Sequence, residues 1–243
     1  MGTVQILGKP WDTITGCTKI SAGCKNCYAE SFTEWINGLK QTDKYQAGFH
    51  QVVCHADWLD RVLAKRARKT YFVNSMADTF HKDVPEEFIQ QIFTVMNAKT
   101  HLNFQVLTKR SERMLEMAPR LDWRGNIWAG VSVENAKLKE RIEHLRAIPA
   151  RRRWIMFEPL VGPVGQMNLE GIEWAIVGGE SGTNWREMNV EWVREIRDQC
   201  IDQGVKFVFK QYAAKKPEKL GRMLDGVLWD QRPEPLTVDA PVG

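Results

Sequence analysis

The sequence predicts an α/β fold on a parallel sheet: a full or partial (β/α) barrel of the TIM type, or as second choice an open doubly wound sheet. Short apolar runs rich in β-branched and aromatic residues alternate with amphipathic segments of helical period from residue 70 to residue 210. Polar or small residues follow each run, as at a rim where the carboxyl ends of parallel strands meet. The length of 243 residues suits one such domain.

The apolar runs give the expected strands. One short strand precedes Cys17, and six follow from Tyr71 onward, at 70–75, 104–108, 127–133, 153–157, 173–177 and 206–210. The amphipathic segments give the expected helices, at 29–39, 57–69, 85–99, 111–117, 136–147 and 190–203. Pro85 suits a first helical turn, and Ser111 is the expected N-cap of its helix. Strands that alternate with helices predict right-handed crossovers and hence a parallel sheet.

A single domain is expected over residues 1–233. Within it, LDGVLWD at 224–230 is expected to form a small hairpin that docks back on the domain, and 234–243 is expected to be a flexible C-terminal tail. The N-terminal residues lack the apolar core of a signal peptide, and no run approaches 18 apolar residues. We therefore expect a cytoplasmic protein that does not associate with membranes.

Composition leaves several partner classes open. The chain has 34 Lys and Arg against 30 Asp and Glu, which permits a polyanionic partner without requiring one. The basic runs at 65–69 and 150–153 are interpreted as solvated helix ends rather than nucleic-acid grooves. Five cysteines in a reducing compartment favour metal or redox use over disulfides. Cys200 lies in a helical pattern and is expected to be a buried, inert thiol.

Three cysteines form the most specific motif. Cys17, Cys24 and Cys27 make a C-x6-C-x2-C array, and a glycine precedes each of the first two, which allows tight backbone turns. Three ligands rather than four leave a coordination position open, and a [4Fe–4S] cluster held by three cysteines keeps one iron free. Two alternatives remain: thiols without metal, or a zinc site whose fourth ligand is one of Cys54, His55 and His50.

The residues that follow the expected strands are the other candidates for a site. They supply polar or small groups at every strand end, which a purely structural barrel does not need, and this favours an enzyme. The candidate catalytic residues are Asp78, Lys109 and Glu158; the candidate binding residues are Tyr28, Asn74, Ser75, Ser132, Glu134, Gly178, Gly179 and Glu180. A hydrolase that uses Asp78, His81 and Glu158 is one of the alternatives.

The pattern W-D-x-x-T-G-C-T-K-I-S-x-G-C-K-N-C-Y-A-E at 11–30 is accompanied by VNSMADTF, VLTKR, WAGVSVEN, FEPL, VGGESG and KQY. Together they resemble a phage- and prophage-associated three-cysteine family from Trp11 to about Pro233. That family is similar to the radical S-adenosylmethionine (SAM) superfamily, and distantly to its spore photoproduct lyase branch. The first cysteine gap is six residues where the superfamily usually has three, and KQYAAKK stands where the family more usually has KQW followed by glycines.

The resemblance implies a [4Fe–4S] cluster on Cys17, Cys24 and Cys27, with SAM chelated at the open iron and cleaved to a 5′-deoxyadenosyl radical. It places Tyr28 beside the adenine, and Asn74, Ser75 and Asp78 where the superfamily binds the SAM amino group. The Gly-Gly-Glu often found after the second strand stands here after the sixth, at 178–180. The implied partners are a flavodoxin- or ferredoxin-type reductant protein and a nucleotide or nucleic-acid substrate. The alternative is a zinc-stabilised phage nucleic-acid-binding protein without catalysis.

Overall fold

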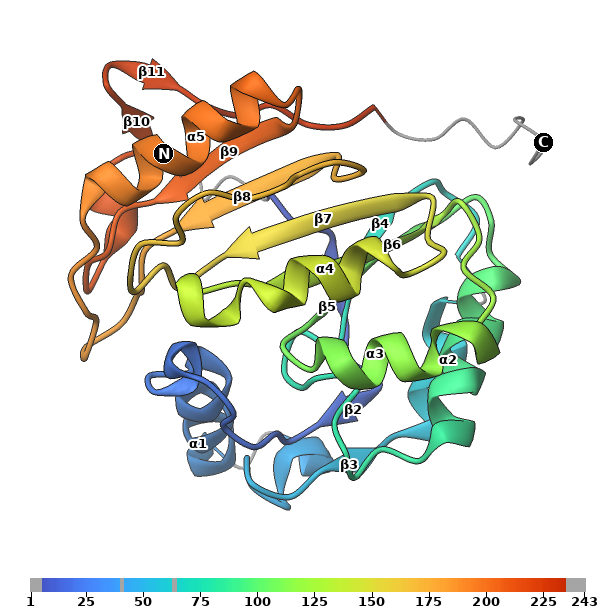
Figure 1. The fold of residues 1–243 in the computed structure, drawn as a ribbon. Helices are drawn as coiled ribbons and strands as arrows, with labels where there is room; N and C mark the ends of the chain where they lie inside the picture. The colour runs from blue at the N-terminus through green and yellow to red at the C-terminus, as the bar shows by residue number, and fades with distance from the viewer. Residues whose placement is uncertain (1–5, 40–41, 63–64, 235–243) are drawn as a thin grey trace.

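The computed structural model describes residues 6–39, 42–62 and 65–234. A seven-stranded sheet in the order β1-β4-β5-β6-β7-β8-β9, with every neighbouring pair parallel, curves into a half-barrel (Figure 1). Its strands are β1 (Lys9–Trp11), β4 (Thr70–Val73), β5 (Asn103–Thr108), β6 (Ile127–Ser132), β7 (Arg152–Phe157), β8 (Trp174–Gly178) and β9 (Lys206–Gln211). The predicted α/β class and its parallel sheet of one early and six later strands are confirmed. Within the described residues β1 and β9 do not pair, so the sheet is open.

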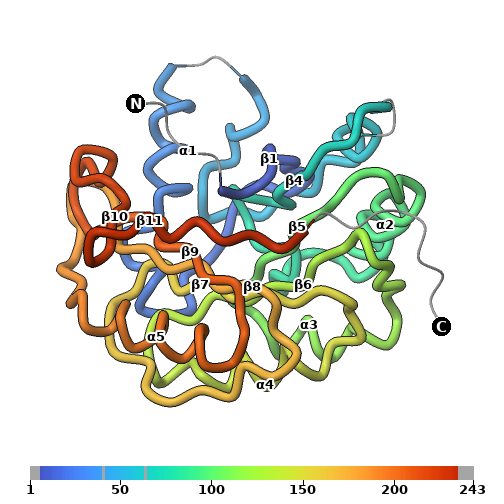
Figure 2. The backbone as a smooth tube through the Cα atoms, turned by 90° about the horizontal axis from the view of Figure 1, so that it is seen from above, coloured from blue at the N-terminus to red at the C-terminus, as the bar shows by residue number. Residues whose placement is uncertain are grey.

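The helices are distributed unequally between the two faces of the sheet. Apolar residues that alternate along the strands pack one face against α2 (Glu86–Asn97), α3 (Ser111–Met117), α4 (Glu140–Arg146) and α5 (Val190–Asp202). Figure 2 shows α3, α4 and α5 on one side of the sheet and α1 (Tyr28–Leu39) on the other. A doubly wound sheet would carry helices on both faces along its length, so the half-barrel arrangement replaces that second choice.

Aromatic residues fill the concave face of the half-barrel. Its buried cluster contains Trp128, Trp154, Met156, Trp174, Ile176 and Val208. The rings of Trp154 and Trp174 lie 5.9 Å apart between centroids, and Gly130 pairs with Trp154 in the ladder. A Cβ atom on Gly130 would lie 2.4 Å from the Trp154 ring, so only glycine leaves room for this indole. The large rings close the amino-terminal part of the concave face and leave the carboxyl end for other uses.

The C-terminal segment covers the free edge of β9. The amide of Phe209 donates to the Trp229 carbonyl at 3.1 Å, and the amide of Gln231 donates to the Phe207 carbonyl at 3.1 Å. Before this contact, β10 (Met223–Leu224) and β11 (Val227–Leu228) pair antiparallel, which confirms the predicted hairpin. Asp225 and Gly226 both have positive φ, at 53° and 76°, as the tight turn between two such strands requires.

Three local predictions are wrong. The segment expected as a helix over 57–69 is a 3-10 helix over Ala56–Val62. Its Trp58 carbonyl accepts a hydrogen bond at 3.0 Å from the indole N–H of Trp11, which is distant in the sequence. The helix expected over 136–147 is divided into a 3-10 turn over Ala136–Leu138 and α4. Ser111 is not an N-cap, because Arg110 holds that position and the Ser111 hydroxyl bonds His144 Nδ1 at 2.9 Å.

Short elements complete the fold. The remaining strands are β2 (Ile14–Thr15) and β3 (Val53–Cys54), which pair antiparallel, and the remaining 3-10 turns cover Ala22–Cys24, Asp43–Tyr45, Ala118–Arg120 and Pro217–Lys219. The predicted tail at 234–243 lies outside the described residues except for residue 234. Among the described helices, none has the length and apolar character needed to cross a membrane.

The packing of Gly130 against Trp154 gives a stability prediction. We expect Gly130→Ala to lower the free energy of unfolding by about 1–3 kcal/mol, because the new methyl group forces the indole out of its position. Gly38→Ala, in α1 with no atom near the new Cβ, is the matched control and should raise that free energy by about 0.5–1 kcal/mol. Denaturant unfolding of both variants measures the difference. Equal effects would contradict the packing argument.

Candidate functional site

A cavity of about 620 Å³ opens at the carboxyl ends of the sheet strands. All seven strands contribute a lining residue, either their own or one that directly follows them. The apolar part of the lining includes Leu7, Pro10, Phe72, Leu107 and Met156. The predicted site residues in the lining are Cys17, Cys24, Cys27, Tyr28, Asn74, Ser75, Asp78, Lys109, Ser132, Glu158, Gly179 and Glu180. The structure therefore brings the three cysteines together with residues from all seven strands at one place.

The loop that carries the cysteines crosses the rim of the sheet. Gly16 has a φ of 81°, and a Cβ there would lie 1.9 Å from the Gln51 carbonyl oxygen, so this turn requires glycine. The Cys17 amide then donates to the Phe49 carbonyl at 2.7 Å. Farther on, a Cβ on Gly23 would lie 2.5 Å from the Glu134 side chain. The predicted tight turn is confirmed at Gly16, whereas Gly23 permits close packing of the loop against Glu134.

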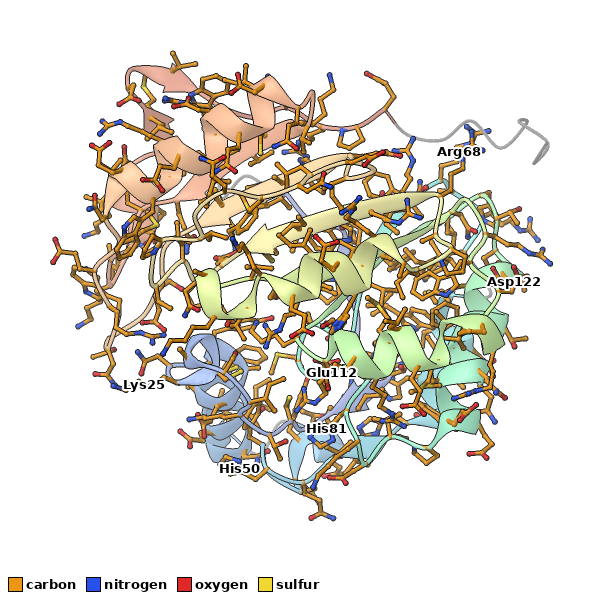
Figure 3. The ribbon with its side chains drawn as sticks, in the orientation of Figure 1. Lys25, His50, Arg68, His81, Glu112 and Asp122 are labelled. Carbon is orange, nitrogen blue, oxygen red and sulfur yellow. The ribbon has the colours of Figure 1, made fainter. Side chains whose placement is uncertain are left out.

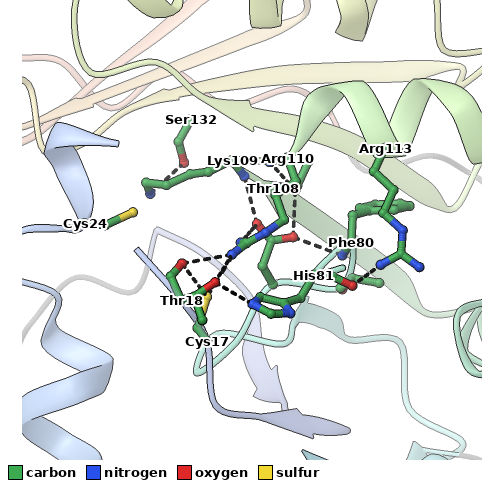
Figure 4. Close-up of polar contacts among 12 residues, drawn as sticks. Cys17, Thr18, Cys24, Phe80, His81, Thr108, Lys109, Arg110, Arg113 and Ser132 are labelled. Atoms are coloured by element: carbon green, nitrogen blue, oxygen red, sulfur yellow. Dashed lines mark hydrogen bonds and ion pairs between the residues drawn. The ribbon is translucent and has the colours of Figure 1, made fainter. Parts of the chain in front are cut away.

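Asp78 and Arg110 connect this loop to the sheet. Asp78, which is buried, accepts from the Phe80 amide and Thr108 hydroxyl on Oδ1, at 3.0 and 2.7 Å. Its Oδ2 accepts from the Lys109 amide and from Arg110 Nη1, each at 3.0 Å. Arg110 Nη1 also lies 3.6 Å from the Cys17 sulfur (Figure 4). Asp78 therefore has four donors and acts on the cysteine loop through Arg110.

The surroundings of Cys17 shift the pKa of its thiol in opposite directions. Burial raises the pKa of the Cys17 thiol to about 11, and the nearby Asp78 carboxylate adds to that rise. The Arg110 guanidinium works in the opposite direction through its charge and its hydrogen bond. Burial alone would lower the pKa of Arg110, but Asp78 and Cys17 outweigh it, so this pKa is raised and the guanidinium stays charged. Nothing in the VLTKR pattern distinguishes Arg110 from its neighbour Lys109, so the sequence did not predict this contact.

His81 supports the same loop from behind. Its Nδ1 accepts from the Asp83 amide at 3.2 Å, so the neutral ring carries its proton on Nε2 and donates to the Thr18 hydroxyl at 2.7 Å. Burial and the Arg110 charge lower the pKa of His81, which favours this neutral form. His81 does not line the cavity, and no side-chain hydrogen bond joins it to Asp78 within the described part of the chain. Among the described residues, Asp78 and His81 therefore do not form a hydrogen-bonded acid–base pair.

Lys109 points into the cavity from the end of β5. Its Nζ lies 3.3 Å from the Ser132 hydroxyl and 3.9 Å from Glu134 Oε1, and Figure 4 shows the side chain reaching toward Ser132 and Cys24. Glu134 is fully buried behind the lining, where Oε1 accepts from the Ser21 hydroxyl at 2.8 Å. Its Oε2 has no hydrogen-bond partner among the described residues. Glu134 therefore supports the cysteine loop rather than forming part of the cavity wall.

Glu158 enters the cavity as an ion pair. Lys210 Nζ contacts both of its carboxylate oxygens, at 2.6 and 2.7 Å, and Gln211 Nε2 donates to Oε1 at 3.3 Å. Gly178 lies behind the pair rather than in the lining, and a Cβ there would be 3.1 Å from the Glu158 carboxyl carbon. Gly178 thus allows the carboxylate to approach β8. The Glu158–Pro159 peptide bond is cis.

Glu180 connects the cysteine loop to the segment after β8. Its carboxylate accepts from Arg186 at 2.9 and 2.6 Å and from Asn26 Nδ2 at 2.9 Å. Burial opposes ionisation, but the hydrogen bonds from Arg186 and Asn26 outweigh it, and the pKa of Glu180 is lowered. Gly179 beside it packs on the Ala213 backbone at a distance that leaves no room for a Cβ. Asn26 stands between two cysteines of the motif, a position that in retrospect marks it as a loop anchor.

Besides Asp78, three residues are expected near SAM, and they have different surroundings. Asn74 is buried, and its Oδ1 accepts from the Thr13 and Ile14 amides at 2.8 and 3.1 Å, so the amide group holds the backbone before Cys17. The Ser75 hydroxyl donates to Asp12 at 2.9 Å. Tyr28 has 58% of its surface exposed, and its hydroxyl donates to the Ser75 carbonyl. Of the three, Tyr28 presents the largest free surface at the mouth of the cavity.

The candidates for a fourth zinc ligand lie outside the cavity that the three cysteines line. His50 contacts Glu30 at 3.1 Å on the outer surface (Figure 3), and His55 bonds the Thr15 hydroxyl at 2.9 Å. Cys54 belongs to β3, and none of these three lines the cavity. Within the described residues, no group of three or more His, Cys, Asp or Glu side chains is arranged to hold a single metal ion. Cys200 is fully buried on α5, and burial raises its pKa to about 12, as expected of an inert thiol.

The fold and site define a class: an open α/β half-barrel with a three-cysteine loop across the carboxyl ends of its strands. The chain belongs to the family described as "Protein of unknown function (DUF5131)", whose model matches residues 2–233. Comparisons with curated proteins and with solved structures give no match. The family match covers the whole half-barrel and the hairpin that follows it.

The Glu158–Lys210 contact gives a prediction about charge in the cavity. We expect Lys210→Met to lower the free energy of unfolding by about 1–3 kcal/mol, because a largely buried carboxylate loses its cation. Glu158→Gln combined with Lys210→Met should cost less than the sum of the two single changes. A double-mutant cycle by denaturant unfolding measures this coupling. Additive effects would show that the two side chains are independent in solution.

Proposed function

We propose that this protein is a cytoplasmic radical-SAM-like iron–sulfur enzyme on a partial TIM-type barrel, which acts on a nucleotide or nucleic-acid substrate. One observation carries the proposal. Three thiols on one loop line the same cavity as residues from all seven strands of the half-barrel. A purely structural thiol site needs no cavity, and a purely structural half-barrel needs no thiols at its open end.

The residues present fit a [4Fe–4S] cluster with SAM beside it. Cys17, Cys24 and Cys27 supply three soft ligands, the number that leaves one iron open, and all three residues line one shared cavity. A cavity of about 620 Å³ lies within the size range of small-molecule sites, so a ligand fits beside the sulfurs. When bound, these groups supply reductive cleavage of SAM to a 5′-deoxyadenosyl radical.

The chain's own residues then have separate tasks. Lys109 and Lys210 each direct an ammonium group into the cavity, where they can bind a carboxylate or phosphate. The exposed Tyr28 ring at the mouth offers a face on which an adenine can stack. Phe72, Leu107 and Met156 make part of the lining apolar, which keeps water from the place where hydrogen would be abstracted.

The open mouth also leaves room for a reductant protein of the flavodoxin or ferredoxin type. Lys25 at the tip of the cysteine loop is exposed and points away from the protein (Figure 3). A cation there suits an acidic electron-transfer partner. The nucleotide or nucleic-acid substrate is proposed on the two ammonium groups and the aromatic mouth, which match a phosphate and a base.

The test is reconstitution of the protein with iron and sulfide under anaerobic conditions. We expect a brown protein with about four irons per chain that releases 5′-deoxyadenosine when given SAM and dithionite. Cys24→Ala should lose both the colour and the product. Cys54→Ala is the matched control, because this half-buried cysteine lies outside the cavity, and it should retain both.

Three outcomes would contradict the proposal in different ways. A brown protein that leaves SAM intact would keep the cluster and exclude the radical reaction. A colourless protein with one zinc would favour the zinc-stabilised nucleic-acid-binding alternative, more so if Cys54→Ala also lost the metal. Activity that is indifferent to reductant and SAM would indicate a hydrolase.

A further inference from the structure

Arg110 brings a positive charge to one of the three sulfurs. Its Nη1 lies 3.6 Å from the Cys17 sulfur, within reach of an N–H···S hydrogen bond. Its Nη2 donates to the Thr18 carbonyl at 2.8 Å and to the Thr18 hydroxyl at 3.2 Å. Among the described residues, no other cationic side chain is hydrogen-bonded to Cys17, Cys24 or Cys27.

The position of Arg110 is set by the surrounding protein. Asp78 accepts from Nη1 at 3.0 Å and is itself held by three further donors, so the guanidinium has a fixed anchor. Nη1 carries two hydrogens, one for the Asp78 carboxylate and one for the sulfur. Both partners are largely buried, with 11% of the Arg110 side chain and 8% of the Asp78 side chain exposed. Solvent therefore screens this contact little.

We propose that Arg110 is a positioning residue that holds Cys17 in its ligating orientation and raises the reduction potential of the cluster; this inference rests on the proposed function. Hydrogen bonds to ligand sulfurs and nearby charge are among the features that set the potential of an iron–sulfur centre. Adding an electron makes the centre more negative, so a donor and a cation at the sulfur stabilise the reduced form more than the oxidised form.

Asp78 acts on the cluster only through Arg110. Its carboxylate carries a negative charge that by itself would disfavour reduction, but the guanidinium N–H groups lie closer to the sulfur. The paired arrangement lets a cation be buried at the cysteine loop without leaving an unpaired charge. A loop anchor alone would need only the bonds to Thr18, so the N–H directed at the sulfur is the feature that points to the cluster.

The experiment compares Arg110→Gln with Arg113→Gln. Arg113 is the matched control, because it stands in the first turn of α3, which Arg110 caps, and donates to the backbone carbonyls of His81 and Val84 but has no hydrogen bond to a sulfur among the described residues. Each protein is reconstituted anaerobically, its iron and sulfide are measured, and the midpoint potential of the cluster is determined by electron paramagnetic resonance in a redox titration. Thermal unfolding of the metal-free proteins shows whether each variant folds.

We expect the Arg110→Gln cluster to be about tenfold harder to reduce, which is a lower potential by about 59 mV for a one-electron couple. Arg113→Gln should keep the wild-type potential, and Arg110→Lys, which retains the charge but not the fork of donors, should fall between them. An Arg110→Gln protein that folds but binds no iron, while Arg113→Gln binds it, would also support the positioning role. In that case the midpoint potential is measured on Arg110→Lys, and we expect it to be lower than that of the wild type.

Two results would overturn the inference separately from the proposed function. Equal midpoint potentials in wild type, Arg110→Gln and Arg113→Gln, with four irons in each, would remove the role of Arg110 and leave the cluster in place. Equal shifts in the two variants would assign the effect to general loosening of the loop. Wild-type protein that binds no iron would instead contradict the proposed function itself, and with it the inference.

Discussion

The site depends most on the hydrogen bonds that the buried Asp78 carboxylate accepts. This carboxylate accepts from donors after β4 and at and after the end of β5, and through Arg110 it reaches the loop that carries Cys17. Its four acceptor positions are all used, so it fixes the distance between the sheet and the cysteine loop. Glu134 and Glu180 repeat the arrangement on the other side of the loop, through Ser21 and Asn26. Three carboxylates at strand ends thus hold one loop across the rim.

The half-barrel brings these contacts together at one rim of the sheet. Parallel strands place all their carboxyl ends on one rim, and side chains there point toward a common space. The large indoles of Trp154 and Trp174 fill the concave face below, while the C-terminal segment covers the free edge of β9. The cavity is therefore confined to the carboxyl end. A protein of this design can exchange loops at the rim without changing its core.

Local patterns predicted the fold well, and long-range contacts limited the prediction of the site. The runs FQVLT and SERMLEM form β5 and α3 almost as expected, because their periodicity is local. The segment expected as a helix over 57–69 is a 3-10 helix over Ala56–Val62, and its Trp58 carbonyl accepts from Trp11, far away in the chain. Arg110 was missed for the same kind of reason: only the folded backbone turns Lys109 toward Ser132 and Arg110 toward Cys17. The strand-end rule located the cavity, but it does not distinguish lining residues such as Glu158 from supporting ones such as Glu134.

The most direct test of this account is iron-edge anomalous diffraction from crystals of the anaerobically reconstituted protein. The account predicts an anomalous peak at the carboxyl ends of the strands, bounded by the sulfurs of Cys17, Cys24 and Cys27, with one side open to the cavity. A peak at the zinc edge with four protein ligands would contradict it. So would iron bound elsewhere, with the three thiols free.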